Sequence, residues 1–272
     1  MEKKVAPYST KLHKDTAWWM AKISKLVYTK ISVDNQMPDE DEILEELKKI
    51  DSDFESVSGF DKNSAQAVII EHKDFICWAF RGTNELVDWI DNLNAFSIKQ
   101  LFGEFHKGFW NSVEDIWSGL WEKQNELQNQ NKRPLFITGH SLGGAMATIA
   151  AARLINEDIP FSAVYTFGQP RAMTRDTSLI FNSECKSRYF RFHNNDDIVT
   201  RVPARVMGFS HIGSYLYITN EMEIHREVGF WFRFIDNIPL NLSDLKANFI
   251  DGIKDHNMDN YILAVEKWDL KK

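Results

Sequence analysis

Apolar side chains recur at helical spacing in several stretches of this chain. In residues 15–29, for example, Trp18, Ile23 and Leu26 lie near one face of a helix. The acidic segment that follows Pro38 indicates a short helix with a solvated face. Helices are therefore predicted over residues 15–29, 38–49, 84–96, 109–128, 242–253 and 257–268.

Short runs rich in Val, Ile, Phe and Trp predict strands between these helices. Residues 66–72 and 75–81 flank a Lys73-Asp74 turn and predict a hairpin. Further strands are predicted over 135–138, 162–167 and 187–193, and a second hairpin over 213–228. Strands that alternate with helices indicate an α/β fold with a mostly parallel central sheet and helices on both faces. Because the chain has no internal repeat and no linker, we expect residues 1–272 to form a single domain.

Composition narrows the class of protein. Hydrophobic residues make up 43% of the chain and charged residues 26%, the balance of an ordinary globular protein. Aromatic residues reach 13%, which predicts a bulky core and leaves some rings for an apolar substrate groove or a surface that meets lipid. The net charge of −7 argues against a nucleic-acid partner and against tight electrostatic docking on anionic membranes.

The compartment is not fixed by the sequence. The two cysteines, Cys77 and Cys185, neither require nor exclude a disulfide. The first residues are followed by polar positions rather than an apolar stretch, so no secretory signal is expected within this sequence, and secretion and a cytoplasmic location both stay open. No run approaches the roughly 18 apolar residues of a spanning helix.

A nucleophile elbow is predicted at Gly139-His140-Ser141-Leu142-Gly143. This G-x-S-x-G pattern lies between the strand at 135–138 and an Ala-rich helix that runs to about residue 155, which is the context the motif requires. A tight strand–turn–helix strains the central residue and needs glycines on both sides. The helix start directs backbone N–H groups at the point where negative charge develops on an attacked carbonyl. The alternative is a Gly-rich turn with an incidental serine.

A serine hydroxyl needs a base to take its proton and a carboxylate to orient that base. In this class of fold the chain order is Ser, then Asp or Glu, then His. Asp196 and Asp197 follow the strand at 187–193 and are the candidate acids. His225 lies in a strand-like run and is expected at the surface, so sequence order leaves His211 and His256 as candidate bases.

Five segments together resemble the class 3 lipases, the fungal-type triacylglycerol lipase family of the α/β hydrolases. They occur in the order and at the separations typical of that family, and the resemblance runs from the helix containing Ala21 to His256. The segments are Phe80-Arg81-Gly82-Thr83, His106-Lys107-Gly108-Phe109, Gly139-His140-Ser141-Leu142-Gly143-Gly144, Tyr165-Thr166-Phe167-Gly168-Gln169-Pro170-Arg171 and Asp197-Ile198-Val199.

The resemblance implies a catalytic site. Ser141 would be the nucleophile, Asp197 the acid because it directly precedes Ile-Val, and His256 the base. Thr83 would supply an oxyanion hole with its backbone N–H and hydroxyl, and Leu142 with its backbone N–H.

Three further positions are compared with the family pattern. His140 matches a family feature of the elbow and is expected to be structural. Thr200 replaces the usual Pro after Asp-Ile-Val, and Lys107 stands where a small residue is common. Neither departure touches the three catalytic candidates, although each affects a local loop.

Residues 84–96 fall where members of the family carry a lid over the active site. Their apolar stripe of Leu86, Trp89, Ile90 and Leu93 is typical either of plain core packing or of a substrate-binding lid. As a lid, this helix would cover the groove in water and turn its apolar face to an oil surface.

The implied function is hydrolysis of acylglycerol esters through an acyl-enzyme, at an oil–water or membrane interface. Phospholipase A1 and feruloyl-type esterase activity on the same scaffold are alternatives, and a non-catalytic lipid-binding module is a more distant one. No clustered ligand spacing suggests a metal or an organic cofactor, and the oligomeric state is not indicated.

Overall fold

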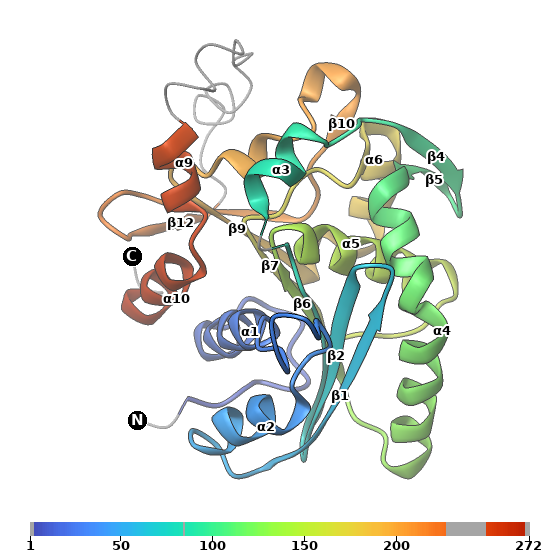
Figure 1. The fold of residues 1–272 in the computed structure, drawn as a ribbon, viewed down its shortest axis with the longest axis vertical. Coiled ribbons are helices and arrows are strands. Elements are labelled where there is room, and N and C mark those ends of the chain that lie inside the picture. The colour runs from blue at the N-terminus through green and yellow to red at the C-terminus, as the bar shows by residue number, and fades with distance from the viewer. Residues whose placement is uncertain (1–2, 84, 227–248, 270–272) are drawn as a thin grey trace.

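The computed structural model describes residues 3–83, 85–226 and 249–269 (Figure 1). Eight strands form the central sheet in the order β1-β2-β3-β6-β7-β9-β11-β12. The strands are β1 (Phe54–Lys62), β2 (Ala65–His72), β3 (Phe75–Phe80), β6 (Leu135–His140), β7 (Ala163–Phe167), β9 (Tyr189–Asn194), β11 (Ser214–Ile218) and β12 (Ile224–Arg226). The five strands from β3 to β11 are parallel, and β1, β2 and β12 are antiparallel to their neighbours.

Helices cover both faces of this sheet, as Figure 1 shows. Helices α1 (Lys14–Leu26), α2 (Glu40–Lys48) and α10 (Met258–Lys267) enclose one apolar core. Helices α4 (Lys107–Gln130) and α5 (Leu142–Asn156) enclose the other. The predicted α/β architecture, with a mostly parallel sheet between two helical layers, is confirmed.

A smaller sheet extends the side of the molecule that carries α4. It has the order β10-β8-β5-β4 and comprises β4 (Ser97–Gln100), β5 (Gly103–His106), β8 (Met173–Thr174) and β10 (Phe209–Ser210). Helix α6 (Arg175–Cys185) follows β8, and three short 3-10 turns occupy Lys186–Arg188, Ile198–Arg201 and Arg205–Met207. None of this smaller sheet was predicted, because its strands are two to four residues long and carry no alternating apolar pattern.

Strand β1 and helix α6 were also missed, for physical reasons. Strand β1 is a half-exposed edge strand in which only Phe54 and Val57 are buried, so it lacks an apolar run. Helix α6 turns Leu179 and Ile180 to solvent. It buries the hydroxyl residues Thr177 and Ser178 beside Phe181 and Cys185, so its apolar residues do not mark one buried face.

The predicted helix over 84–96 is shorter in the structure, where α3 spans Leu86–Asp91 and the chain then enters β4. The predicted helix over 242–253 begins outside the described residues, which show only α9 (Phe249–Asp255). The last two positions of the predicted hairpin over 213–228 also lie outside them.

The two cysteines lie in different cores. Cys77 is buried between the sheet and α1, whereas Cys185 is buried in the core beneath α4 and α5, and both are free thiols. The sheet therefore separates them, and they do not pair. Among the described residues, no helix combines the length and apolar character needed to cross a bilayer.

Candidate active site

Ser141 lies in a strained turn between β6 and α5. Its backbone angles are φ 59° and ψ −133°, a conformation that residues other than glycine rarely adopt. The glycines on either side leave no room for a side chain. A Cβ atom on Gly143 would lie 2.1 Å from the carbonyl oxygen of Phe80, and one on Gly139 would lie 2.3 Å from the oxygen of Gly143. The turn is thus held against the end of the neighbouring strand β3.

Two potential donors for an oxyanion converge on this turn. Leu142 is the first residue of α5, and the N–H groups in the first turn of a helix have no intrahelical acceptor. Thr83 follows the end of β3, where Phe80 is paired with Gly139 of β6. The Thr83 hydroxyl accepts a hydrogen bond from the Glu85 N–H at 3.1 Å, which leaves its own proton free to be donated elsewhere.

Asp197 and His256, which are 59 residues apart, form a buried hydrogen-bonded pair. The His256 Nδ1 lies 3.0 Å and 2.8 Å from the two carboxylate oxygens of Asp197. The Asp197 carboxylate also accepts hydrogen bonds from the Tyr261 hydroxyl at 2.5 Å and the Val199 N–H at 2.9 Å. A carboxylate so placed fixes the imidazole tautomer with its proton on Nδ1, leaving Nε2 to act as a base.

Two opposed effects act on the pKa of the Asp197 carboxyl group. Complete burial on its own raises the pKa of the carboxyl group. The facing His256 ring, together with hydrogen bonds from His256 and Tyr261, outweighs burial and holds the pKa of Asp197 below its usual value. Asp197 is therefore an ionised partner for an imidazole that gains a proton.

Three observations place Ser141 near the Asp197–His256 pair. The Ser141 N–H donates to the Phe167 oxygen at 3.0 Å, which places it beside Gly168. A Cβ atom on Gly168 would lie 2.7 Å from the His256 ring. The neighbouring His140 ring stacks on the His256 ring with centroids 4.3 Å apart. The Ser141 Oγ and His256 Nε2 are both buried, and neither has a hydrogen-bond partner among the described residues.

The other candidate acid and bases lie elsewhere. Asp196 forms an exposed ion pair with Arg201 at 2.8 Å. His211 donates from Nε2 to the Thr200 oxygen at 2.7 Å. His225 is half-exposed on β12, 3.7 Å from Glu223. The geometry thus brings Asp197 and His256 together, and leaves Asp196, His211 and His225 out of that contact.

Two residues with a part in this geometry were not predicted as site residues. Tyr261 lies on α10, and its buried hydroxyl contacts Asp197. Its only sequence signal is a polar hydroxyl on the buried face of the last helix, five residues after His256. Gly168 has φ +58°, and a Cβ atom there would lie 2.7 Å from both Asp197 and His256. Its position in a Gly-Gln-Pro turn is a signal for an unusual backbone, although not for its neighbours.

The predicted lid residues lie next to the elbow. All four apolar side chains of the stripe, Leu86, Trp89, Ile90 and Leu93, are half-buried, and α3 contains no fully buried residue. Trp89 and Leu93 line a cavity of about 410 Å³ that reaches Leu142. Ser141 itself is only 1% exposed. The nucleophile candidate is therefore buried in this conformation, and α3 lies beside a cavity that reaches its neighbour Leu142.

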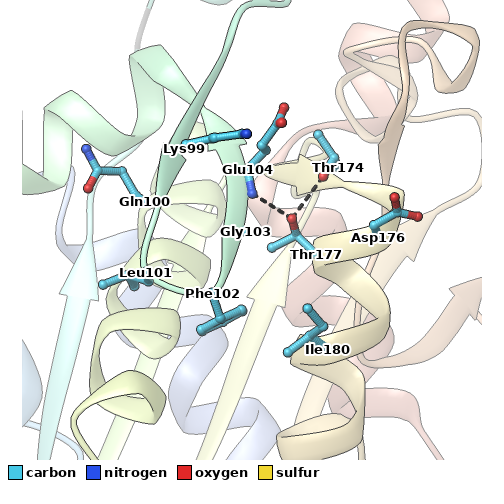
Figure 2. A pocket seen from close by; sticks show the side chains of 10 residues that line it. All are labelled: Lys99, Gln100, Leu101, Phe102, Gly103, Glu104, Thr174, Asp176, Thr177 and Ile180. Carbon is cyan, nitrogen blue, oxygen red and sulfur yellow. Dashed lines mark hydrogen bonds between the residues drawn. The ribbon is translucent and has the colours of Figure 1, made fainter.

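A second cavity, of about 570 Å³, lies between the β4–β5 hairpin and α6 (Figure 2). Figure 2 shows the Glu104 N–H directed at the Thr177 hydroxyl, which in turn contacts Thr174. Its lining combines charged side chains, such as Lys99, with apolar ones, such as Phe102. None of the predicted catalytic or oxyanion residues lines it, so it lies outside the candidate site.

A cluster of Asp51, Asp53 and His72 offers carboxylate and imidazole atoms within 4.8 Å of one another. The His72 Nδ1 accepts a hydrogen bond from the Asp74 N–H at 3.0 Å. The proton of a neutral ring must then lie on Nε2, which faces Asp51 at 3.4 Å. This arrangement fits a hydrogen-bonded histidine better than a metal ligand.

The chain is similar in sequence to known proteins. Residues 77–207 match the family model described as Lipase (class 3). Secreted mono- and diacylglycerol lipase 1 from Fusarium solani is 32% identical over 142 residues, which are 48% of this chain and 40% of that protein. Phospholipase A1-II 1 from Oryza sativa subsp. indica is 30% identical over 169 residues, or 52% of this chain and 42% of that protein. The chain spans about half the length of the curated relatives that it matches.

Solved structures share the fold. The Rhizomucor miehei lipase in complex with its propeptide, a deletion mutant, superposes with a TM-score of 0.65 at 24% identity, covering 76% of this chain and 67% of that one. A triacylglycerol lipase described as having a serine-protease triad at its catalytic centre gives a TM-score of 0.64 at 23% identity, covering 74% and 78%. At this identity the likeness establishes the α/β-hydrolase fold, as predicted.

Substitution of Gly168 is expected to separate Asp197 from His256. In Gly168→Ala the new methyl group meets both side chains and the backbone is strained at φ +58°, so we expect a loss of more than about 1 kcal/mol in unfolding free energy. Displacement of the ring should lower ester hydrolysis by about a hundred-fold. Urea unfolding and hydrolysis of a short-chain aryl ester measure the two effects.

Gly208→Ala is the matched control for Gly168→Ala. Gly208 has φ +88°, but no described atom lies within 4 Å of the Cβ position, so this variant reports backbone strain without a clash. Equal activity in the two variants would contradict the role assigned to Gly168.

Three histidines whose pKa is lowered by desolvation predict a loss of stability in mild acid. Burial lowers the pKa of His106 to about 4 and of His140 to about 3, and lowers that of His211 well below its usual value. Between the ordinary histidine pKa and these values the unfolded chain binds protons that the folded chain does not. The free energy of unfolding therefore falls as pH drops below about 6.5, by up to about 1.4 kcal/mol per pH unit for each histidine.

Urea unfolding between pH 7.5 and 5 measures this slope. His140→Gln should reduce the slope by about a third, since one of the three histidines is removed. His225→Gln removes a half-exposed histidine and should leave the slope unchanged. An unfolding free energy that stays flat over this range contradicts the prediction.

Proposed function

Since this chain belongs to the class 3 lipase family, we propose that it hydrolyses carboxylic esters of acylglycerols, with Ser141 as nucleophile, His256 as base and Asp197 as the acid that orients the base. The observation that carries the proposal is the buried Asp197–His256 hydrogen bond beside a strained serine turn. A hydrolytic site needs this order of groups, because the hydroxyl must lose a proton to an oriented imidazole.

The proposed cycle passes through an acyl-enzyme. The His256 Nε2 takes the Ser141 proton while Oγ attacks the ester carbonyl carbon, and the C–O bond to the alcohol breaks as His256 returns the proton to the leaving oxygen. Water then attacks the acyl-enzyme with the same base. The backbone N–H groups of Thr83 and Leu142, and the Thr83 hydroxyl, would stabilise the oxyanion in each half-reaction.

The substrate class is supported by the apolar side of the cavity beside the elbow. Trp89, Leu93 and Phe96 line that side together with Leu142 and suit an acyl chain, whereas the rest of the lining is largely polar, with residues such as Asn94 and Asn111. The net charge of −7 also favours a neutral lipid over an anionic surface.

Phospholipase A1 activity is the second candidate, and the match to the rice phospholipase favours it. Both reactions use the same acyl transfer and differ in the leaving group. A panel of triacylglycerols, diacylglycerols, phosphatidylcholine and feruloyl esters separates these substrate classes by relative kcat/KM.

We also propose that residues 84–96, with α3 at their centre, form a lid over Ser141. The nucleophile is 1% exposed, whereas α3 is six residues long and has no side-chain hydrogen bond at its N-cap. An ester can reach Ser141 only if this cover moves, and an oil surface would accept the apolar side chains that face the cavity.

Replacing the nucleophile should abolish activity without unfolding the protein. We expect Ser141→Ala to lower kcat by about 10⁶-fold, by analogy with another triad enzyme. A fluorophosphonate probe should label the parent chain at Ser141 and leave this variant unlabelled. Ser183→Ala, which changes an exposed serine on α6, should be labelled and active like the parent. Activity above a few per cent in Ser141→Ala overturns the assignment.

A lid predicts interfacial activation. The rate against a short-chain triacylglycerol should rise steeply as the substrate passes its solubility limit, because the new oil surface stabilises the displaced apolar side of α3. Val87 already exposes 42% of its surface. Val87→Ser, at a residue that does not line the cavity, should therefore reduce the jump and leave the rate on dissolved ester unchanged. A smooth curve through the solubility limit in the parent chain counts against a lid.

A further inference from the structure

His140 contacts the proposed base at two places. It is the last residue of β6, directly before Ser141, and it is buried. Its Nε2 lies 2.8 Å from the backbone oxygen of His256. Its ring stacks on the His256 ring, with 4.3 Å between centroids and 30° between planes. The residue expected to be merely structural thus holds both the backbone and the ring face of His256.

The hydrogen bonds fix which nitrogen of His140 carries the proton. A backbone carbonyl only accepts hydrogen bonds, so the His140 Nε2 must donate to His256. The His140 Nδ1 is then an acceptor, and the Tyr28 hydroxyl at 2.9 Å donates to it. A directed chain of hydrogen bonds therefore runs from Tyr28 through His140 to His256.

Two pKa shifts keep His140 and Tyr28 each in one protonation state. Burial, with a smaller effect from His256, lowers the pKa of His140 to about 3, so the ring stays neutral. Burial raises the pKa of Tyr28, so its hydroxyl keeps the proton that it donates. A neutral His140 can stack on His256 without repelling the positive charge that His256 gains when it takes a proton.

The Asp197 contact alone does not fix the His256 ring. A hydrogen bond at Nδ1 leaves the ring free to swing about that contact, and Nε2 lies on the far side of the ring. His256 lies in the short connection between α9 and α10, where its own N–H donates to the Ile253 oxygen at 3.1 Å. Among the described residues, His140 contacts its backbone oxygen and stacks on its ring, and Gly168 lies close to the same ring.

We propose that His140, held in one tautomer by Tyr28, is a positioning residue that aligns the His256 ring for proton transfer with Ser141. This inference rests on the proposed hydrolase function. The alternative is that His140 and Tyr28 only fill the core, in which case they affect stability and not the rate of the chemical step.

Substitutions at His140 separate its two contacts. His140→Phe keeps an aromatic ring for stacking and removes the hydrogen bond to His256, whereas His140→Gln keeps an amide N–H in reach of that oxygen. We expect His140→Phe to lower kcat on a dissolved aryl ester by roughly ten- to hundred-fold, with KM within about two-fold of the parent. His140→Gln should recover part of this loss. His225→Phe, on the half-exposed face of β12, is the matched control and should behave like the parent.

Tyr28→Phe tests the hydrogen-bond chain without altering any atom that touches His256. It should lower kcat less than His140→Phe does, and the two losses should not add, because the hydroxyl acts through the imidazole. Tyr8→Phe, at a tyrosine that is 83% exposed, is its control. Additive losses in the double variant overturn the role of Tyr28, and a folded His140→Phe variant with parent kcat overturns the role of His140.

A proton NMR measurement reads the ring position without a substrate. The proton on the His256 Nδ1 is shared with Asp197 and buried, so it should give a slowly exchanging downfield signal in the parent chain, confirmed by its loss in His256→Gln. In His140→Phe the signal should broaden or exchange faster, and an unchanged signal overturns the proposal. If the parent neither hydrolyses esters nor reacts with fluorophosphonate, the proposed function fails, whereas this signal still decides whether His140 positions the ring.

Discussion

The close approach of α5 to the end of β3 is the constraint on which the site depends. Gly143 passes so near the Phe80 carbonyl that a single methyl group would occupy the same space. That contact fixes where α5 begins, and so where Leu142 points its N–H and where Ser141 must adopt its strained backbone. The parallel pairing of β3 with β6 brings Thr83 to the same edge of the sheet. One packing contact thus positions three groups that the proposed chemistry uses.

A polar network ties the C-terminal helices to this edge. The Asn194 side chain donates to the Asp255 oxygen at 2.8 Å, and the Asn194 N–H donates to the Tyr261 hydroxyl at 3.1 Å. Tyr261 in turn donates to Asp197. Buried polar groups are costly unless each finds a partner, so these bonds favour one docking position for α9 and α10. The position of His256 is therefore decided by many contacts besides its own hydrogen bond to Asp197.

Local features of the site could be predicted from sequence, and long-range ones could not. The elbow at Ser141 is encoded in five consecutive residues between a strand and a helix. The choice between His211 and His256 depends on how segments 59 residues apart dock, so chain order left both open and the family resemblance selected His256. Gly168 and Tyr261 were missed for the same reason. Strand β1 and helix α6 were missed because the positions of their apolar residues do not match the positions that are buried in the folded protein.

Some elements around the candidate site are held by many contacts, and others by few. The nucleophile turn and the Asp197–His256 pair are enclosed by buried side chains and by hydrogen bonds on several sides. Helix α3, the proposed lid, contains no fully buried residue, and Trp89 reaches the core through a ring contact with Phe109, with 6.0 Å between ring centroids. Displacing α3 breaks few contacts, whereas displacing His256 breaks a network. In the proposed lid mechanism, opening would therefore cost little while the geometry beneath would be costly to disturb, so access would change and the alignment of the proposed reacting groups would be preserved.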